Sequence, residues 1–246
     1  MINAGRGIGV VAAAAMLLAS GVASASIVGK ALRVSVTSPT MGSGVLEVDQ
    51  SEGTWSGDTW TWRSGSGGIP IKNAQGQTLA TLSNTTMRFM NDPVVSLSFS
   101  LMAGGSGINA TIASGLLSFP TIYAEGKASA SVTVTDSDGD GALLTGMASG
   151  GEMYSAHYNG YLGAGTTFAS HDGASLAAGA WDSNSISESL GFLTIGNVYD
   201  MSAQYAFNLS ANDQASGTSV WVTQEIPAPG ALALLGLAGF AARRRR

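Results

Sequence analysis

Period-two alternation dominates the middle of this chain. In the segment VVSLSFSLM, residues 94–102, the apolar Leu97, Phe99 and Leu101 alternate with serines. The segments SASVTVTD and MSAQYAFNLS alternate in the same way. Successive side chains of a strand point to opposite faces, so this pattern predicts strands that bury one face and expose the other.

Turn residues separate these runs, in clusters such as MGSG, SGSGG, AGGSG and DSDGDG. The body of the chain has no helical apolar pattern sustained over three turns. Many short strands with frequent turns predict an all-β fold. We expect a two-sheet antiparallel β-sandwich, jelly-roll-like, with an N-terminal signal helix and a short C-terminal hydrophobic helix. The stretch from Gly150 to Gly196 is less regular and is expected to hold long loops.

Composition fits one folded, acidic domain. The chain has 246 residues, of which 45% are apolar and 11% charged, and we place the β-sandwich domain at residues 26–225. The body holds all 16 acidic residues and only six of the 11 basic ones, which makes it a poor partner for nucleic acid phosphates. The chain has no cysteine, so it forms no disulfide and no thiolate metal site.

The first 26 residues, MINAGRGIGVVAAAAMLLASGVASAS, have the layout of a secretory signal peptide. One arginine precedes an apolar run, and small residues follow it. Ala23 and Ala25 form an A-x-A site, so we expect signal peptidase to cut before Ser26 and to remove residues 1–25. The alternatives are an N-terminal membrane anchor and a buried helix.

The last residues, IPAPGALALLGLAGFAARRRR, place two prolines before an apolar run and a basic end. The 14 residues from Pro229 to Ala242 would form about 21 Å of helix, which is short for a hydrocarbon core of about 30 Å. Positive flanks stay on the cytoplasmic side, so the tail would hold the chain in the membrane with its body outside. The flank consists of Arg243, Arg244, Arg245 and Arg246.

This order of Pro-x-Pro, apolar helix and arginine cluster resembles the PEP-CTERM sorting tail of exported bacterial proteins. The motif here is Pro227-Ala228-Pro229, with alanine where the family usually has glutamate. The resemblance implies cleavage by an exosortase, a membrane-embedded cysteine protease-transpeptidase, and release of the body to the cell surface or to exopolysaccharide. It covers residues 226–246 and says nothing about the body. The alternative is a plain C-terminal membrane anchor.

An aspartate-rich segment is the best candidate for a ligand site. Asp136, Asp138 and Asp140 alternate with Ser137 and Gly139, and calcium prefers several oxygen ligands presented in this manner. The spacing matches the first half of an EF-hand loop, but Met147 occupies the twelfth position, where a bidentate carboxylate is required. The segment therefore predicts either a possible Ca²⁺ site completed by another loop or a turn after a strand.

Tryptophans form a second candidate in TWSGDTWTW, which contains Trp55, Trp60 and Trp62. In a strand, Trp60 and Trp62 share a face. If exposed, they would form a platform for sugar rings. If buried, they would supply core area.

The sequence offers little support for catalysis. The only histidines are His157 and His171, and no motif pairs a nucleophile with a base. We therefore expect an exported, non-catalytic protein of the cell surface or extracellular matrix, without a required cofactor. The alternatives are a carbohydrate-binding module assisted by calcium and a glycan hydrolase with carboxylates that no motif marks.

Overall fold

The structure is a computed structural model and describes residues 25–65 and 67–227. The expected all-β antiparallel fold is confirmed for these residues. The strands are β1 (Ser26–Ser38), β2 (Gly42–Val48), β3 (Thr54–Ser56), β4 (Thr59–Arg63), β5 (Ile69–Lys72), β6 (Thr78–Met90), β7 (Val94–Ala103), β8 (Ile108–Thr135), β9 (Ala142–Gly146), β10 (Tyr154–Tyr158), β11 (Thr166–His171), β12 (Ser175–Ala178), β13 (Ser183–Leu209) and β14 (Gln214–Glu225). Single 3-10 turns occur at η1 (Gln50–Glu52), η2 (Ser149–Gly151) and η3 (Leu162–Ala164).

Within the described residues, all 14 strands belong to one hydrogen-bonded sheet. Its main path runs β11-β10-β13-β8-β14-β7-β6-β4-β3, and the remaining strands attach at its sides. The expectation of long loops between Gly150 and Gly196 is wrong, because this stretch contains β10, β11, β12 and the first part of β13. Its many Ser, Ala and Gly residues give little contrast between the two faces of a strand, so the alternation is weak there.

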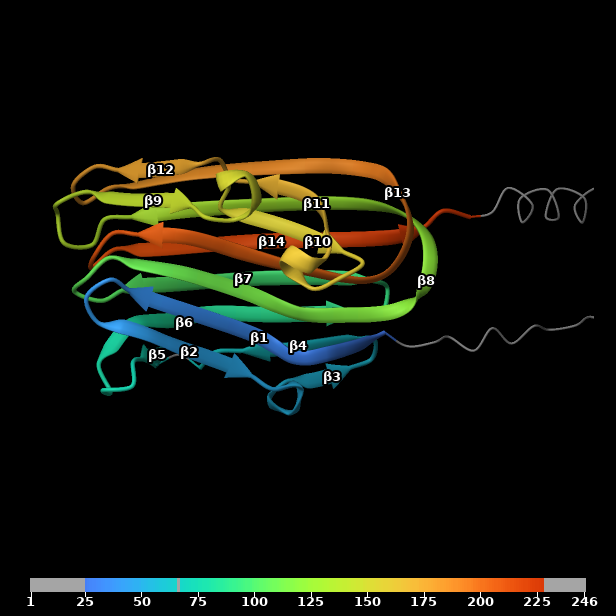
Figure 1. The fold of residues 1–246 in the computed structure, drawn as a ribbon, viewed down its shortest axis with the longest axis horizontal. Helices are drawn as coiled ribbons and strands as arrows, with labels where there is room; N and C mark the ends of the chain where they lie inside the picture. Colours follow the sequence, from blue (N-terminus) through green and yellow to red (C-terminus); the bar gives the residue numbers. More distant parts are fainter. Residues whose placement is uncertain (1–24, 66, 228–246) are drawn as a thin grey trace, which may run out of the picture.

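Two long, bent strands join the parts of the sheet (Figure 1). β8 has 28 residues and β13 has 27, and they pair with each other on both sides of the bend. Before the bend β8 pairs with β1, and after it β8 pairs with β14. Their register shifts between Ser118 and Ile122, where Pro120 has no N–H to donate. We call residues 118–126 of β8 and 190–199 of β13 the bend tip.

The core is formed by side chains from different parts of this sheet. Phe99 of β7 contacts Tyr205 of β13 with ring centroids 4.9 Å apart. Phe168 of β11 stacks on Trp221 of β14 at 4.4 Å, and the Trp221 indole donates a hydrogen bond of 3.2 Å to the carbonyl oxygen of His157. These contacts join strands that are not neighbours in the sheet order. The strands stabilise each other because the contacts bury large aromatic side chains.

The alternation predicted for the strands is confirmed where the apolar residues are large. Leu97, Phe99 and Leu101 of β7 are all buried. On the other face, hydroxyl side chains of five neighbouring strands line up in register. One such rank consists of Ser185, Thr133, Ser216, Ser100 and Ser83. Hydroxyls rather than charges thus face outward on this side, which agrees with the low charged content of the chain.

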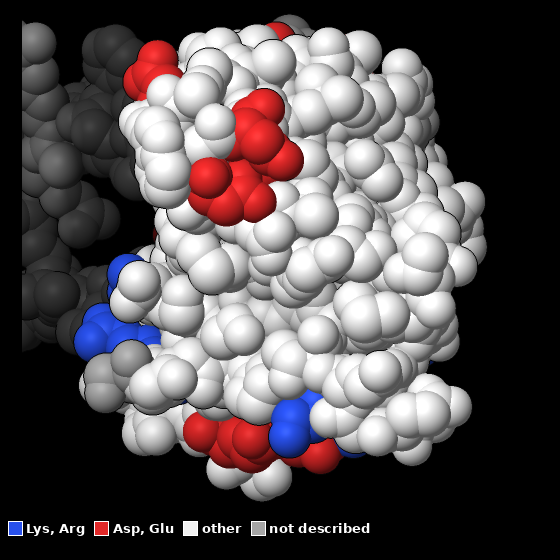
Figure 2. Space-filling view, turned by 90° about the vertical axis from the view of Figure 1, so that its left-hand side faces the viewer, with Lys and Arg blue, Asp and Glu red and all other residues white. Residues whose placement is uncertain are grey.

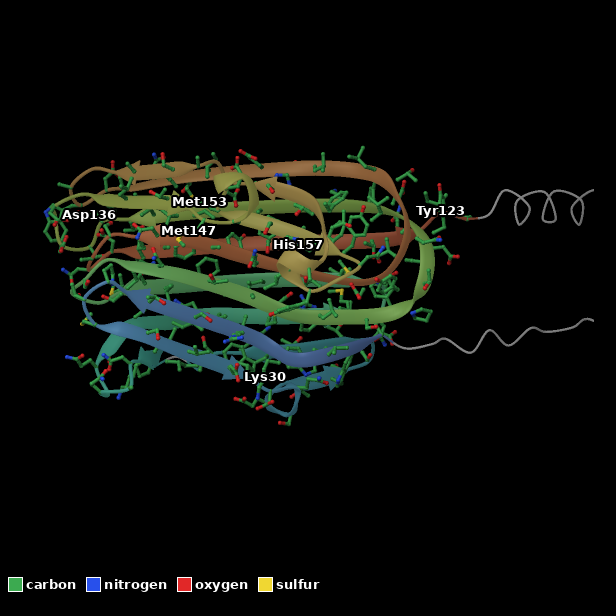
Figure 3. All side chains as sticks on the ribbon, in the orientation of Figure 1. Lys30, Tyr123, Asp136, Met147, Met153 and His157 are labelled. Carbon is green, nitrogen blue, oxygen red and sulfur yellow. The ribbon has the colours of Figure 1, made fainter. Side chains whose placement is uncertain are left out.

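The two ends of the sheet are built differently (Figures 1 and 3). The described chain enters at Ser26, which pairs with Ser118, and leaves at Glu225, which pairs with Ala124. Both ends of the body therefore lie at the bend tip. The turns that follow β8 and β13 lie at the opposite end, where Figure 3 labels Asp136. We call residues 136–141 and 210–213 the aspartate tip.

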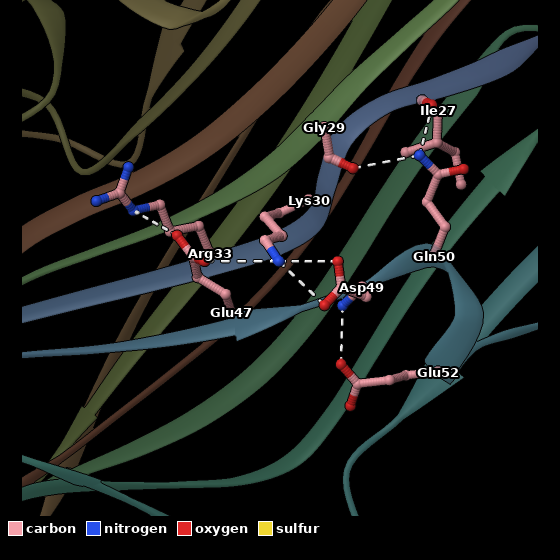
Figure 4. A network of polar contacts seen from close by, with 8 residues as sticks. All are labelled: Ile27, Gly29, Lys30, Arg33, Glu47, Asp49, Gln50 and Glu52. Carbon is pink, nitrogen blue, oxygen red and sulfur yellow. Dashed lines mark hydrogen bonds and ion pairs between the residues drawn. The ribbon is translucent and has the colours of Figure 1, made fainter.

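A small ionic network fastens η1 and β2 to β1 (Figure 4). The Lys30 ammonium donates hydrogen bonds of 2.8 and 3.0 Å to the two carboxylate oxygens of Asp49. This interaction raises the pKa of Lys30. Arg33 lies 3.7 Å from the Glu47 carboxylate, and the Gln50 amide donates to the Ile27 carbonyl oxygen at 2.7 Å. The ion pairs are exposed, so they fix the position of the turn more than they stabilise the fold.

Candidate metal centre

The turn after β8 folds around the side chain of Asp136. This residue is only 3% exposed, and its carboxylate accepts backbone hydrogen bonds from Trp181 at 2.5 Å, Gly139 at 2.9 Å and Gly141 at 3.0 Å. Gly139 and Gly141 have φ of +90° and +94°, which glycine adopts without the strain that a Cβ brings. The N–H of Trp181 and those of the two glycines lower the pKa of Asp136, so the group stays charged.

A fourth aspartate, which the sequence analysis did not single out, completes the cluster. Asp213, in the turn between β13 and β14, is fully buried. Its carboxylate accepts hydrogen bonds from the Ser210 hydroxyl at 2.5 Å and the Ser137 N–H at 3.3 Å. One carboxylate oxygen each of Asp136, Asp140 and Asp213 lies within 4.8 Å of the others.

The structure therefore brings together two of the three predicted residues, Asp136 and Asp140. Asp138 does not complete this trio and instead accepts a hydrogen bond of 2.9 Å from the Asn212 amide. Met147 lies away from Asp136 (Figure 3), so the loop does not continue as an EF-hand. Asp213 is distant in sequence, in the turn segment AND, and no local spacing linked it to the others.

The electrostatics of the cluster favour a bound cation. A side-chain hydrogen bond with Asp138 and its negative charge raise the pKa of Asp140, with smaller contributions from burial and from the charges of Asp213 and Asp136. Figure 2 views this end of the molecule and shows a compact acidic group bordered by uncharged residues. Like charges held this close disfavour ionisation, and a divalent cation would relieve the repulsion. The all-oxygen donor set suits Ca²⁺ and does not suit Zn²⁺.

The tryptophans belong to the core. Trp60 is fully buried, Trp62 is 7% exposed, and the Trp60 ring packs on Phe89 at 5.7 Å. The Trp60 indole donates a hydrogen bond of 3.0 Å to the Gln50 carbonyl oxygen. The hypothesis that Trp60 and Trp62 form a platform for sugar rings is therefore wrong, because neither ring is exposed to a ligand. The packing of β4 against the body buries both tryptophans. A short alternating segment of sequence does not show which of its faces will be buried.

The histidines also lie inside the body. The Ser155 hydroxyl and His157 Nε2 are 2.9 Å apart, a spacing that suits a nucleophile and its base. Burial lowers the pKa of His157, which keeps the ring neutral. Ser155, however, is fully buried, so no substrate reaches its hydroxyl in this conformation.

Several buried polar side chains lie near β10 and β11. They are Tyr154, His171, Asp172 and Ser219, and within the described residues Nε2 of His171 has no hydrogen-bond partner. Burial, reinforced by the charges of Glu188 and Glu152, raises the pKa of Asp172 to about 7. Nδ1 of His171 lies 3.5 Å from the Glu188 carboxylate. Asp172 can therefore hold a proton near neutral pH, but its side chain is fully buried.

The processing sites fall largely outside the described residues. Ala23 precedes them, Ala25 is the first of them, and Ser26 is the first residue of β1. Pro227 is the last, so Ala228, Pro229 and the arginines 243–246 lie beyond the described part of the chain. Among residues 25–65 and 67–227, no helix has the length and apolar character needed to cross a membrane.

Comparisons with known proteins identify no family for this chain. No family model and no curated protein sequence matches it. Among solved structures it is similar to the enzymatically active domain of tailspike protein 4 from bacteriophage CBA120, with 12% identity, a TM-score of 0.26, and coverage of 78% of this chain and 19% of the other.

Two further solved structures show likenesses of the same order. The arabinose-bound MgGH51 α-L-arabinofuranosidase has 18% identity, a TM-score of 0.25 and coverage of 63% and 24%. The infectious bursal disease virus Gx strain structure has 10% identity, a TM-score of 0.28 and coverage of 84% and 63%. The chain thus spans less than two thirds of each of these three chains. At these TM-scores, the likenesses carry no argument about fold or activity.

Proposed function

We propose that this chain is an exported, non-catalytic protein of the cell surface or extracellular matrix. Its body would be a two-layer, jelly-roll-like β-sandwich, held transiently or permanently at the membrane by the apolar segment Ala231–Ala242. One observation carries the proposal: both ends of the body lie at the bend tip. A chain that leaves through one end of a rigid sheet can be tethered by that end without disturbing the fold.

The proposal includes two processing partners. Signal peptidase would cut before Ser26, the first residue of β1, so cleavage would leave every strand intact. An exosortase-like enzyme would act at Pro227-Ala228-Pro229, just beyond the end of β14 at Glu225. The released body would reach the surface or exopolysaccharide, and the retained form would stay anchored.

The non-catalytic assignment rests on accessibility. The Ser155–His157 pair is buried, and the described residues at the aspartate tip include no histidine that could act as a base for Ser137 or Ser210. The carbohydrate-binding alternative depended on an exposed aromatic platform. Because Trp60 and Trp62 are buried, we do not propose that function on these residues.

Intact-mass measurement on membrane and medium fractions of the producing cells tests the proposal. We expect a chain that begins at Ser26, and a released form that lacks the arginine cluster. Ala228→Glu, which restores the family motif, should increase the released share, whereas Pro227→Ala with Pro229→Ala should keep the chain in the membrane fraction. Recovery of the native chain from the cytosol with Met1 and Arg246 intact would contradict export.

A further inference from the structure

Exposed apolar side chains gather at the bend tip. Tyr123 is 55% exposed, Phe192 42%, Leu193 51% and Tyr199 46%. The strand register places all four at this end of the sheet, because Asn197 of β13 pairs with Tyr123 and Leu193 pairs with Gly126. Such side chains normally avoid water, and several of them exposed at one end of a body indicate a contact site.

The chain leaves the body through this same surface. The Ile226 N–H donates a hydrogen bond of 2.8 Å to the carbonyl oxygen of Tyr123, which holds the start of the tail against β8. From Ile226 to Ala231, where the apolar segment begins, the chain spans at most about 18 Å when fully extended. A tail inserted in a bilayer therefore keeps the bend tip at or near the lipid headgroups.

We propose that the bend tip contacts the interfacial region of the bilayer that holds the tail, giving the body a second attachment and a fixed orientation. This inference rests on the proposed membrane-held form. Tyrosine and phenylalanine are suited to the interface, because their rings enter the acyl boundary while polar atoms stay hydrated. The Lys127 ammonium lies 5.7 Å from the centre of the Phe192 ring, and its stem can extend toward headgroup phosphates.

The opposite end is chemically different. Trp181 is 73% exposed there, but it lies beside the acidic groups of the aspartate tip (Figure 2), and the phosphates of lipid headgroups repel carboxylates. Asp136 and Tyr123 lie at opposite ends of the sheet (Figure 3). With the bend tip on lipid, the aspartate tip is the part of the body farthest from the membrane.

Single-cysteine labelling of the full chain tests this inference, because the chain has no cysteine of its own. Leu193→Cys would carry an environment-sensitive fluorophore at the bend tip. Met102→Cys is the matched control, since Met102 is 40% exposed and pairs with Gln214 near the aspartate tip. A third variant, Leu235→Cys, reports insertion of the tail. All are reconstituted in phosphatidylcholine vesicles and quenched with aqueous iodide.

We expect iodide quenching at position 193 to fall severalfold on reconstitution, while quenching at position 102 stays unchanged. A label at position 193 that remains as accessible as the control, while the label at position 235 is protected, overturns the inference and leaves the proposed function intact. An accessible label at position 235 overturns the membrane-held form itself. Concentration-dependent protection of position 193 without vesicles shows that a second copy covers the tip, which also overturns the inference. Tyr123→Cys repeats the measurement should Leu193→Cys misfold.

Discussion

The aspartate tip and the bend tip are formed by the same two strands, β8 and β13, yet they differ in charge and in backbone structure. At the aspartate tip the strands end, and buried carboxylates are held by backbone N–H groups. At the bend tip the strands continue through a turn of direction, and Tyr123, Leu193 and Tyr199 stay exposed. The two ends of these strands therefore carry different chemistry. One end presents carboxylates that suit a cation, and the other presents side chains that suit an apolar surface.

Removal of the Asp136 carboxylate should have a large effect on stability, because it disrupts the aspartate tip. Asp136→Ala leaves the N–H groups of Trp181, Gly139 and Gly141 without their acceptor. Hydrogen bonds to a charged acceptor stabilise more than those between neutral groups, so we expect a clear loss in the free energy of unfolding. Urea denaturation measures this loss, with Asp138→Ala as the exposed control. Equal losses for both variants would contradict the role of Asp136.

Calcium binding should depend strongly on Asp213, one of the two buried members of the cluster. Asp213→Asn removes one charge from the trio of carboxylates, and we expect the affinity for Ca²⁺ to fall by about 10–100-fold. Asp138→Asn should change it much less, because Asp138 lies outside the trio. Isothermal titration with Ca²⁺ provides the measurement. An absence of Ca²⁺ binding by the wild-type chain would show that the aspartates only shape a turn.

The pH dependence of stability should separate Asp172 in the interior from Asp136 at the tip. The folded pKa of Asp172 is raised to about 7, so its contribution to stability is present below the ordinary aspartate pKa and is lost as pH rises toward 7. The pKa of Asp136 is lowered, so its contribution is present above the ordinary pKa and is lost on acidification.

Asp172→Asn should therefore be more stable than the wild type at pH 8, by roughly 1–2 kcal/mol, and should gain less at pH 4. Thermal unfolding across this pH range measures the difference, with Asp182→Asn as a control in an exposed turn. A wild-type chain whose stability does not fall between pH 4 and pH 7 would contradict the raised pKa of Asp172.

A substitution at the bend tip should have the smallest effect on the free energy of unfolding. Leu193→Ser replaces an exposed side chain and should change the free energy of unfolding by less than about 0.5 kcal/mol. Leu97→Ser, within β7 of the core, is the contrasting variant and should destabilise by several kcal/mol. Urea denaturation of both variants provides the test. A large loss for Leu193→Ser would show that this residue packs in the body and is not free for an outside contact.

The sequence predicted local structure well and long-range pairing poorly. Alternation identified β7 and the later part of β8, because large apolar residues such as Leu97 and Val132 contrast with hydroxyls. It did not predict that β8 continues through Pro120 and changes partners, because pairing beyond a bend depends on distant strands. The sequence predicted only part of the carboxylate cluster, because the remaining member depends on the pairing of distant strands. Asp136 and Asp140 share one turn, whereas Asp213 approaches only after β13 and β14 have paired with β8.

The tail leaves from β14, a central strand. β14 is hydrogen-bonded along nearly its whole length to β8 on one side, and to β7 on the other. A pulling force on the tail runs along the strand axis, so it loads both ladders in shear and does not peel an edge strand away one bond at a time. In the proposed membrane-held form, the body would therefore bear tension on its tail without unravelling from that end.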